Sequence, residues 1–131
     1  MLRSIRNLDY SVIICRNVEQ MKAFYHDVMG FEIYRDFGSW VEFRTGSVLL
    51  TLRERSTGYE GVKEHDGDVP KGVATVQLAF RVAPPEVDAC FDELKTKGVD
   101  ILQEPITRDT GHRTLFFTDP ENNILEIYAD V

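Results

Sequence analysis

The sequence predicts an α+β fold of two βαβββ modules whose strands form a curved mixed sheet. Three observations support this prediction. Each half holds one amphipathic stretch among β-branched runs, a glycine follows each of these stretches, and the order of elements repeats. We take the chain as a single domain, with a first module over 6–54, a linker over 55–72 and a second module over 73–131.

The first module is expected to open with a strand over 8–15, where β-branched residues cluster. Asn17 is a typical helix N-cap, and it predicts a helix that continues until Gly30. Three further strands are predicted over 31–37, 40–44 and 48–52.

The second module repeats this order. A strand is predicted over 73–82, and Pro84-Pro85 then opens a helix that Gly98 ends. Pro105 is expected to break the next strand, so that residues 103–113 form a long connection. The three later strands are predicted over 99–102, 114–118 and 124–129.

Aligning the two halves pairs residues that play the same structural part. Tyr10 and Gln77 pair at an offset of 67 (77 − 10), and Leu50 pairs with Glu126 at an offset of 76 (126 − 50). Two such modules are expected to leave a cleft between them, and a ligand would bind there. The linker over 55–72 is rich in glycine and charged residues. Two interpretations of it stay open, a lid and a strap that crosses to a partner subunit.

Composition narrows the function classes. The formal net charge of −7 opposes binding to nucleic acid and to anionic membranes. No apolar run is long enough for a signal peptide or a membrane span. Cys15 and Cys90 lack metal or redox spacing, so we expect free buried thiols in a reducing, cytoplasmic compartment.

Segments spread over nearly the whole chain also match a known pattern in order and spacing. They are LDYSVII (8–14), NVE (17–19), AFY (23–25), VMGFE (28–32), QLAFRV (77–82) and FFTDPENNILE (116–126). Through them the chain resembles the vicinal-oxygen-chelate superfamily, which includes glyoxalases, bleomycin-resistance proteins and dioxygenases. The resemblance implies a curved sheet and often a homodimer. Its enzymes use a divalent metal such as Ni, Zn, Mn or Fe, whereas other members bind drugs without one.

The resemblance places metal ligands on the first and last strand of each module. Those positions hold Tyr10, Leu50, Gln77 and Glu126, of which only Glu126 is an ordinary metal ligand. We therefore expect no metal and no other cofactor. We expect instead a polar floor in which Tyr10, Gln77 and Glu126 satisfy one another.

Our first hypothesis is a metal-free protein that binds a small aromatic or amphipathic molecule. A metal-dependent glyoxalase-I-like lyase or isomerase, or a dioxygenase-like enzyme, would instead use Glu126 and Gln77 as surviving ligands. A third hypothesis is a metal-free enzyme that uses Glu126 as a general base. His26 is expected on the first helix, facing away from any cleft, and His65 is interpreted as solvated in the linker. His112 and Arg113 are candidates at the rim of the cleft. The predicted ligand-binding residues are Tyr10, Trp40, Leu50, Gln77, His112, Arg113 and Glu126.

Overall fold

The computed structural model describes residues 1–55, 69–72, 74 and 76–131. Most of the predicted linker, and His65 with it, therefore lies outside the described residues. The chain divides into two compact units, Met1–Asp66 and Gly67–Val131. No helix in the described part of the chain is long and apolar enough to cross a membrane.

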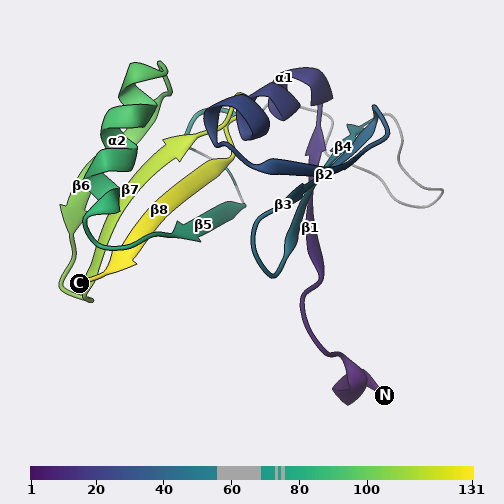
Figure 1. The fold of residues 1–131 in the computed structure, drawn as a ribbon, viewed down its shortest axis with the longest axis horizontal. Coiled ribbons are helices and arrows are strands. Elements are labelled where there is room, and N and C mark those ends of the chain that lie inside the picture. Colours follow the sequence, from purple (N-terminus) through teal and green to yellow (C-terminus); the bar gives the residue numbers. More distant parts are fainter. Residues whose placement is uncertain (56–68, 73, 75) are drawn as a thin grey trace. The chain divides into compact units, whose positions relative to one another are not determined.

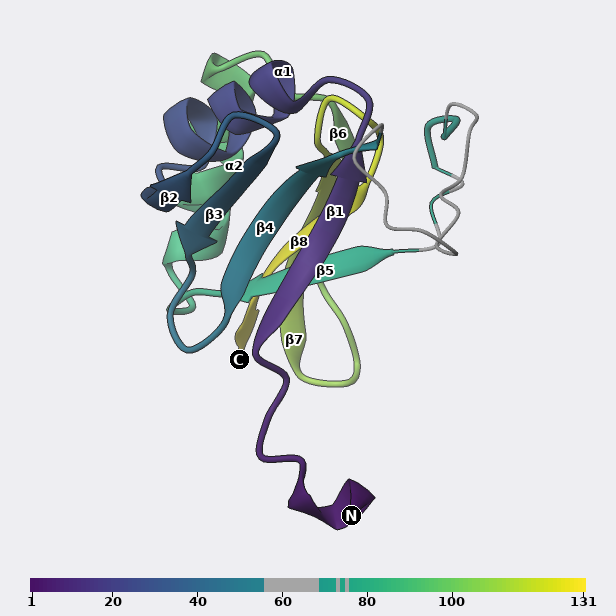
Figure 2. The same ribbon diagram turned by 90° about the vertical axis from the view of Figure 1, so that its right-hand side faces the viewer.

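The first unit is a βαβββ module, as predicted (Figure 1). Its strands lie in the order β1-β4-β3-β2, with β1 parallel to β4 and the other pairs antiparallel (Figure 2). Asn17 caps the helix by accepting a hydrogen bond from the Gln20 amide at 3.0 Å. The elements are η1 (Leu2–Ser4), β1 (Tyr10–Cys15), α1 (Val18–Ala23), a π-helical turn η2 (Phe24–Val28), β2 (Glu32–Asp36), β3 (Trp40–Arg44) and β4 (Leu49–Glu54).

The second unit repeats the arrangement, with strand order β5-β8-β7-β6. Gly30 and Gly98 end the helical segments of the two units with φ of 75° and 73°, a conformation that glycine adopts without strain. The elements are β5 (Gln77–Arg81), α2 (Glu86–Thr96), β6 (Ile101–Thr107), β7 (His112–Thr118) and β8 (Ile124–Asp130).

Two predictions for the second unit are wrong. Pro105 does not break the strand, because β6 is the edge strand of its sheet and an irregular register between Gln103 and Ile106 accommodates the proline. The expected long connection over 103–113 is instead mostly strand, since β6 ends at Thr107 and β7 begins at His112.

Each sheet has one face, the helix face, that packs against the helical segment of its unit and an opposite face, called the open face here because the helical segment does not cover it. Several side chains of the open faces are nevertheless buried, among them Glu42, Thr51 and Thr114. In the first unit the Tyr25 ring of the π-helical turn lies 6.2 Å from the Phe43 ring, so Phe43 and its paired residue Leu50 mark the helix face. In the second unit Arg113 binds Asp88 of α2 and marks the helix face of β7. Residues that alternate with these lie on the open faces. The open-face residues are Tyr10, Val12, Ile14, Trp40, Glu42, Thr51 and Arg53 in the first unit, and Gln77, Ala79, Arg81, His112, Thr114, Phe116, Glu126, Tyr128 and Asp130 in the second.

Candidate ligand-binding faces

A hydrogen-bonded polar cluster lies on the open face of the second sheet. Gln77 Nε2 donates to Glu126 Oε2 at 2.8 Å, and Thr114 Oγ1 donates to Glu126 Oε1 at 2.7 Å. Glu126 is half-buried, and Thr114 is buried with 1% of its surface exposed. The carboxylate is therefore fixed by a donor from each neighbouring strand, β5 and β7.

Apolar residues flank this carboxylate. Strand register places Ala79 and Phe116 directly beside Glu126, one on each neighbouring strand. Side chains at directly paired positions of neighbouring strands share a face and contact one another. The open face therefore combines one oriented carboxylate with an apolar surround, as ligand sites for amphipathic molecules do.

Farther along the same face, a second cluster gathers around Asp130. His112 Nε2 lies 3.1 Å from Asp130 Oδ1, and Arg81 pairs with Asp130 Oδ2. The His112 ring also lies 5.0 Å from the Tyr128 ring. His112 is thus on the open face, whereas its neighbour Arg113 is not.

Arg113 joins β7 to α2. Its Nε and Nη2 donate to the two oxygens of Asp88 at 2.7 and 2.6 Å, and Nη1 donates to Thr107 at 3.1 Å. The hydrogen bonds from Arg113 lower the pKa of Asp88 below its ordinary value. All of these contacts lie on the helix side, so the geometry gives Arg113 a structural part, and its predicted ligand contact stays a prediction.

The open face of the first sheet is aromatic. The Tyr10 and Trp40 rings meet edge to face with centroids 6.2 Å apart, and the Tyr10, Val12 and Ile14 side chains are partly exposed. Glu42 lies beside them and accepts hydrogen bonds from Arg35 at 2.5 and 3.1 Å. These bonds to Arg35 lower the pKa of Glu42, and burial only partly opposes them.

The predicted equivalence of Leu50 and Glu126 is wrong by one residue. Leu50 pairs with Ser11, one step after Tyr10, whereas Glu126 pairs with Ala79, two steps after Gln77. The counterpart of Glu126 is therefore Thr51. Leu50 lies on the helix face with 4% of its surface exposed, where it is part of the core.

Thr51 stands out chemically. It is fully buried, and its hydroxyl has no hydrogen-bond partner among the residues that the structure describes. A buried hydroxyl in this state costs free energy, on the order of 1–3 kcal/mol. Among the described residues, the first sheet therefore has an unsatisfied hydroxyl at the position where the second sheet has a fixed carboxylate.

The superfamily that the chain resembles places its metal ligands on the first and last strand of each module. With the corrected register, this chain has Tyr10, Thr51, Gln77 and Glu126 at those positions. One carboxylate among a phenol, an alcohol and an amide does not fit a tightly held divalent cation, which prefers several His, Cys, Asp or Glu ligands. Within each unit, no three such side chains of the described residues gather as a metal site. Both oxygens of Glu126 already accept a hydrogen bond.

Within the second unit, Gln77 and Glu126 of the predicted network bond as expected, and Thr114 adds a second donor. Tyr10 belongs to the first unit, where its ring contacts that of Trp40, and its predicted bond to Glu126 stays a prediction. Thr114 could have been found from its place in a strand next to the Glu126 strand. His26 lies in the π-helical turn of the first unit, and its Nδ1 is 3.0 Å from the Phe31 carbonyl oxygen.

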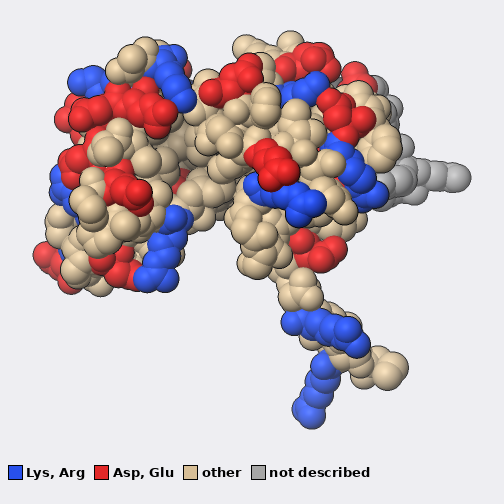
Figure 3. All heavy atoms as spheres, in the orientation of Figure 1, with Lys and Arg blue, Asp and Glu red and all other residues tan. Residues whose placement is uncertain are grey.

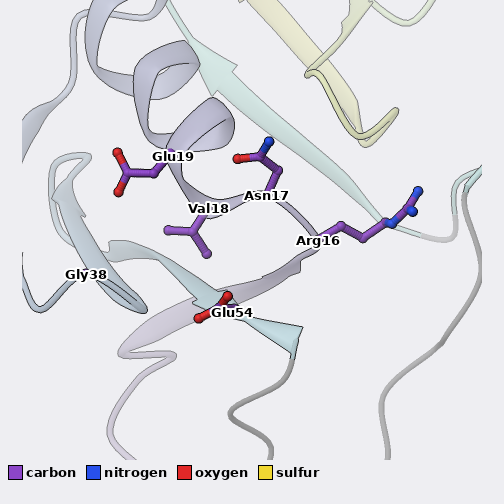
Figure 4. Close-up of a pocket in the computed structure, with 6 residues that line it drawn as sticks. All are labelled: Arg16, Asn17, Val18, Glu19, Gly38 and Glu54. Atoms are coloured by element: carbon purple, nitrogen blue, oxygen red, sulfur yellow. The ribbon is translucent and has the colours of Figure 1, made fainter.

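A hollow of about 290 Å³ lies elsewhere, where α1 begins beside the end of β4 (Figure 4). None of the predicted site residues lines it. Its wall has mixed charge, and the Asn17 side chain there is used to cap the helix. The lining residues are Arg16, Asn17, Val18, Glu19, Gly38 and Glu54.

Comparison with known proteins supports the family. The family model for a glyoxalase-like domain matches residues 8–131. The uncharacterized protein YwkD of Bacillus subtilis is 31% identical over 95% of this chain and 97% of its own length. The metallothiol transferase FosB of Staphylococcus haemolyticus is 22% identical over 98% of this chain and 85% of its own. A glyoxalase/bleomycin resistance protein/dioxygenase from Nocardioides has a TM-score of 0.86 at 20% identity, over 98% and 85% of the two chains, and supports the fold.

Proposed function

The chain belongs to the glyoxalase-like domain family of the vicinal-oxygen-chelate superfamily, and from this premise we propose that it binds a small organic molecule without a metal. The binding surface is the open face of the second sheet. The observation that supports this most is the Glu126 carboxylate, which Gln77 and Thr114 orient from both sides. Cys15 and Cys90 form no disulfide, which supports a reducing, cytoplasmic compartment.

The chemistry of the face suggests the ligand. An ionised carboxylate has about four lone-pair positions, and Gln77 and Thr114 use two of them. The remaining positions suit a hydroxyl or amine donor, while Ala79 and Phe116 suit an apolar body. A small amphipathic or aromatic molecule with one donor group meets both demands. Tyr10 and Trp40 give the first unit a separate aromatic surface for a ring.

A second candidate is a metal-dependent lyase, isomerase or dioxygenase-like enzyme, and the FosB relatives, which are named metallothiol transferases, favour it. The donor set at Tyr10, Thr51, Gln77 and Glu126 argues against it. A metal-free enzyme that uses Glu126 as general base is compatible with the same cluster, because a fixed carboxylate can accept a proton.

The test uses Glu126→Gln, which keeps the shape of the side chain and removes its charge. Phenol, catechol and benzylamine serve as probes in calorimetric titrations, and Glu104→Gln on the exposed part of β6 is the matched control. We expect Glu126→Gln to weaken the best probe about tenfold, or 1.4 kcal/mol, and Glu104→Gln to leave binding unchanged.

Equal affinity in wild type and Glu126→Gln would contradict the proposal. Titration with nickel, zinc and manganese then separates the alternatives. Stoichiometric metal binding that Glu126→Gln abolishes would establish the metal-dependent enzyme instead. Normal ligand binding with lost turnover in Glu126→Gln would assign the carboxylate as a base.

A further inference from the structure

Two charged side chains of the second unit are held in place by neutral partners. Glu126 accepts its hydrogen bonds from the uncharged side chains of Gln77 and Thr114. Arg108, the exposed residue that follows β6, donates from Nη2 to the neutral Gln103 Oε1 at 2.7 Å. Among the described residues, no ion pair reaches the Glu126 carboxylate or the Arg108 guanidinium. One negative and one positive charge are therefore oriented but not neutralised.

The other arginines of the second unit are neutralised within it. Acidic and basic side chains lie next to one another on the face of this unit that Figure 3 shows. Arg81, Arg108 and Arg113 are the arginines of Gly67–Val131. Arg81 is paired with Asp130, and Arg113 is paired with Asp88. Arg108 is the arginine that this pairing leaves over, so its charge is available to a ligand.

Strand register places the two unpaired charges at the same level of the open face. Phe116 of β7 pairs with Glu126 of β8 on one side and with Gln103 of β6 on the other. The Arg108 guanidinium carbon lies 5.8 Å from the centroid of the Phe116 ring. This is close to the outer limit of a cation–π contact, about 6 Å, so the ring does not hold the guanidinium tightly. A carboxylate and a guanidinium therefore flank one aromatic ring.

The spacing of the strands sets the length of a molecule that contacts both charges. Neighbouring strands lie about 4.8 Å apart, so β8 and β6, with β7 between them, lie about 10 Å apart. Phe116 is half-buried in the middle of this span, and Ala79 of β5 continues the apolar surface on the other side of Glu126. A benzene ring with one polar group at each end has a length of this order.

We propose that the ligand is a zwitterion built on an aromatic ring, with an amine that binds Glu126 and a carboxylate that binds Arg108. This inference rests on the proposed function and adds an anionic group to its ligand. A guanidinium has five N–H donors in a planar fork that matches the two oxygens of a carboxylate, and Gln103 uses one of them. The zwitterion gives each of the two side chains the opposite charge that the described residues do not supply.

Calorimetric titration of the full chain with two probes tests this inference. Benzylamine has the ring and the amine, and 4-(aminomethyl)benzoate adds a carboxylate at the opposite end of the ring. In wild type we expect 4-(aminomethyl)benzoate to bind at least tenfold more tightly than benzylamine. In Arg108→Gln we expect the two probes to bind equally. Because Arg108 is exposed, the circular dichroism spectrum of this variant is expected to match that of wild type.

Arg44→Gln is the matched control. Arg44 of β3 also lies over an aromatic ring, that of Tyr34 at 4.4 Å, but it forms an ion pair with Glu32 at 3.9 Å. We expect Arg44→Gln to keep the wild-type ratio of the two dissociation constants. Added salt is expected to lower this ratio in wild type, because Arg108 is exposed to solvent.

Glu126→Gln separates this inference from the proposed function. We expect it to weaken both probes while the ratio of their dissociation constants stays as in wild type. A 4-(aminomethyl)benzoate that binds no more tightly than benzylamine would overturn the inference, and so would a ratio that Arg108→Gln leaves unchanged. In either case, weaker binding of benzylamine to Glu126→Gln would still support the proposed function. If neither these probes nor phenol and catechol bind, both proposals fail.

Discussion

The two units share one architecture but differ in the chemistry of their open faces. Both order their strands in the same way and end their helical segments at a glycine with positive φ. The second unit fixes a carboxylate, Glu126, with two donors, whereas the first has at the same register position a buried hydroxyl, Thr51, that has no hydrogen-bond partner among the described residues. The helix faces maintain the fold, and the open faces are therefore where the two halves have become different.

The largest expected effect tests whether the helix faces are equivalent. Leu50 and Leu125 occupy matching positions and are 4% and 0% exposed. Leu50→Ala and Leu125→Ala are each expected to lower the free energy of unfolding by about 2–5 kcal/mol, because each leaves a cavity in a packed core. Urea unfolding followed by circular dichroism measures both losses.

The same pair tests the corrected position of Leu50. Ligand affinity in Leu50→Ala is expected to stay unchanged under conditions where the protein is folded, since Leu50 faces the helix. A loss of affinity without a loss of stability would show that Leu50 contacts the ligand after all, as the sequence alignment predicted.

The misplacement of Leu50 has a local cause that the sequence hides. Gly46 and Asn122 both have positive φ, so the two turns were aligned correctly. However, two residues separate Gly46 from the start of β4 at Leu49, and only one separates Asn122 from the start of β8 at Ile124. One extra residue shifts the register by one, and a shift of one moves every side chain to the opposite face.

Other features were predictable because they depend on local chemistry. Asn17 and Gly30 mark the ends of a helical segment through capping and positive φ, which need no tertiary context. Pro105 was misread because its tolerance depends on β6 being an edge strand, which is a property of the whole sheet. The predicted strands already place Thr114 next to the Glu126 strand, but the bond between the two residues was missed because it also depends on strand register, a property of the sheet.

The second prediction uses the two threonines to sharpen the contrast between the open faces. Thr114→Val removes the hydrogen bond to the Glu126 carboxylate and is expected to lower the free energy of unfolding by about 1.5–3 kcal/mol. Thr51→Val replaces a buried hydroxyl, which none of the described residues bonds, with a methyl group of similar size. It is expected to raise the free energy of unfolding by about 1 kcal/mol.

Thermal or urea unfolding of both variants decides this, with Thr51→Ser and Thr114→Ser as controls that keep each hydroxyl. Opposite signs for the two valine variants are the expected outcome. A loss of stability in Thr51→Val like that in Thr114→Val would mean that a bound water satisfies the Thr51 hydroxyl. The buried polar groups of both open faces would then be hydrogen-bonded.

The smallest expected effect concerns two carboxylates, each of which is paired with an arginine but in different surroundings. Arg35 lowers the pKa of Glu42 on the open face of the first sheet, and Arg113 lowers the pKa of Asp88 on the helix side of the second unit. A carboxyl group whose pKa is lower in the folded chain stabilises fully above its unfolded pKa. This stabilisation is lost as the pH falls through its folded pKa. Both pairs therefore favour the fold at neutral pH and cease to do so in acid.

Glu42→Gln is expected to destabilise the chain at pH 7 and to match wild type at a pH below the folded pKa of Glu42, with Asp88→Asn as the comparison. The Glu42 side chain is 5% exposed, whereas that of Asp88 is 55% exposed, so added salt is expected to screen the Asp88 pair more strongly. Unfolding curves from pH 7 into acid, at low and high salt, measure both effects.

If Glu42→Gln lost the same stability at every pH, the Glu42 side chain would stabilise the fold through packing and not through charge. The open face of the first sheet would then depend on shape where the second depends on a fixed charge.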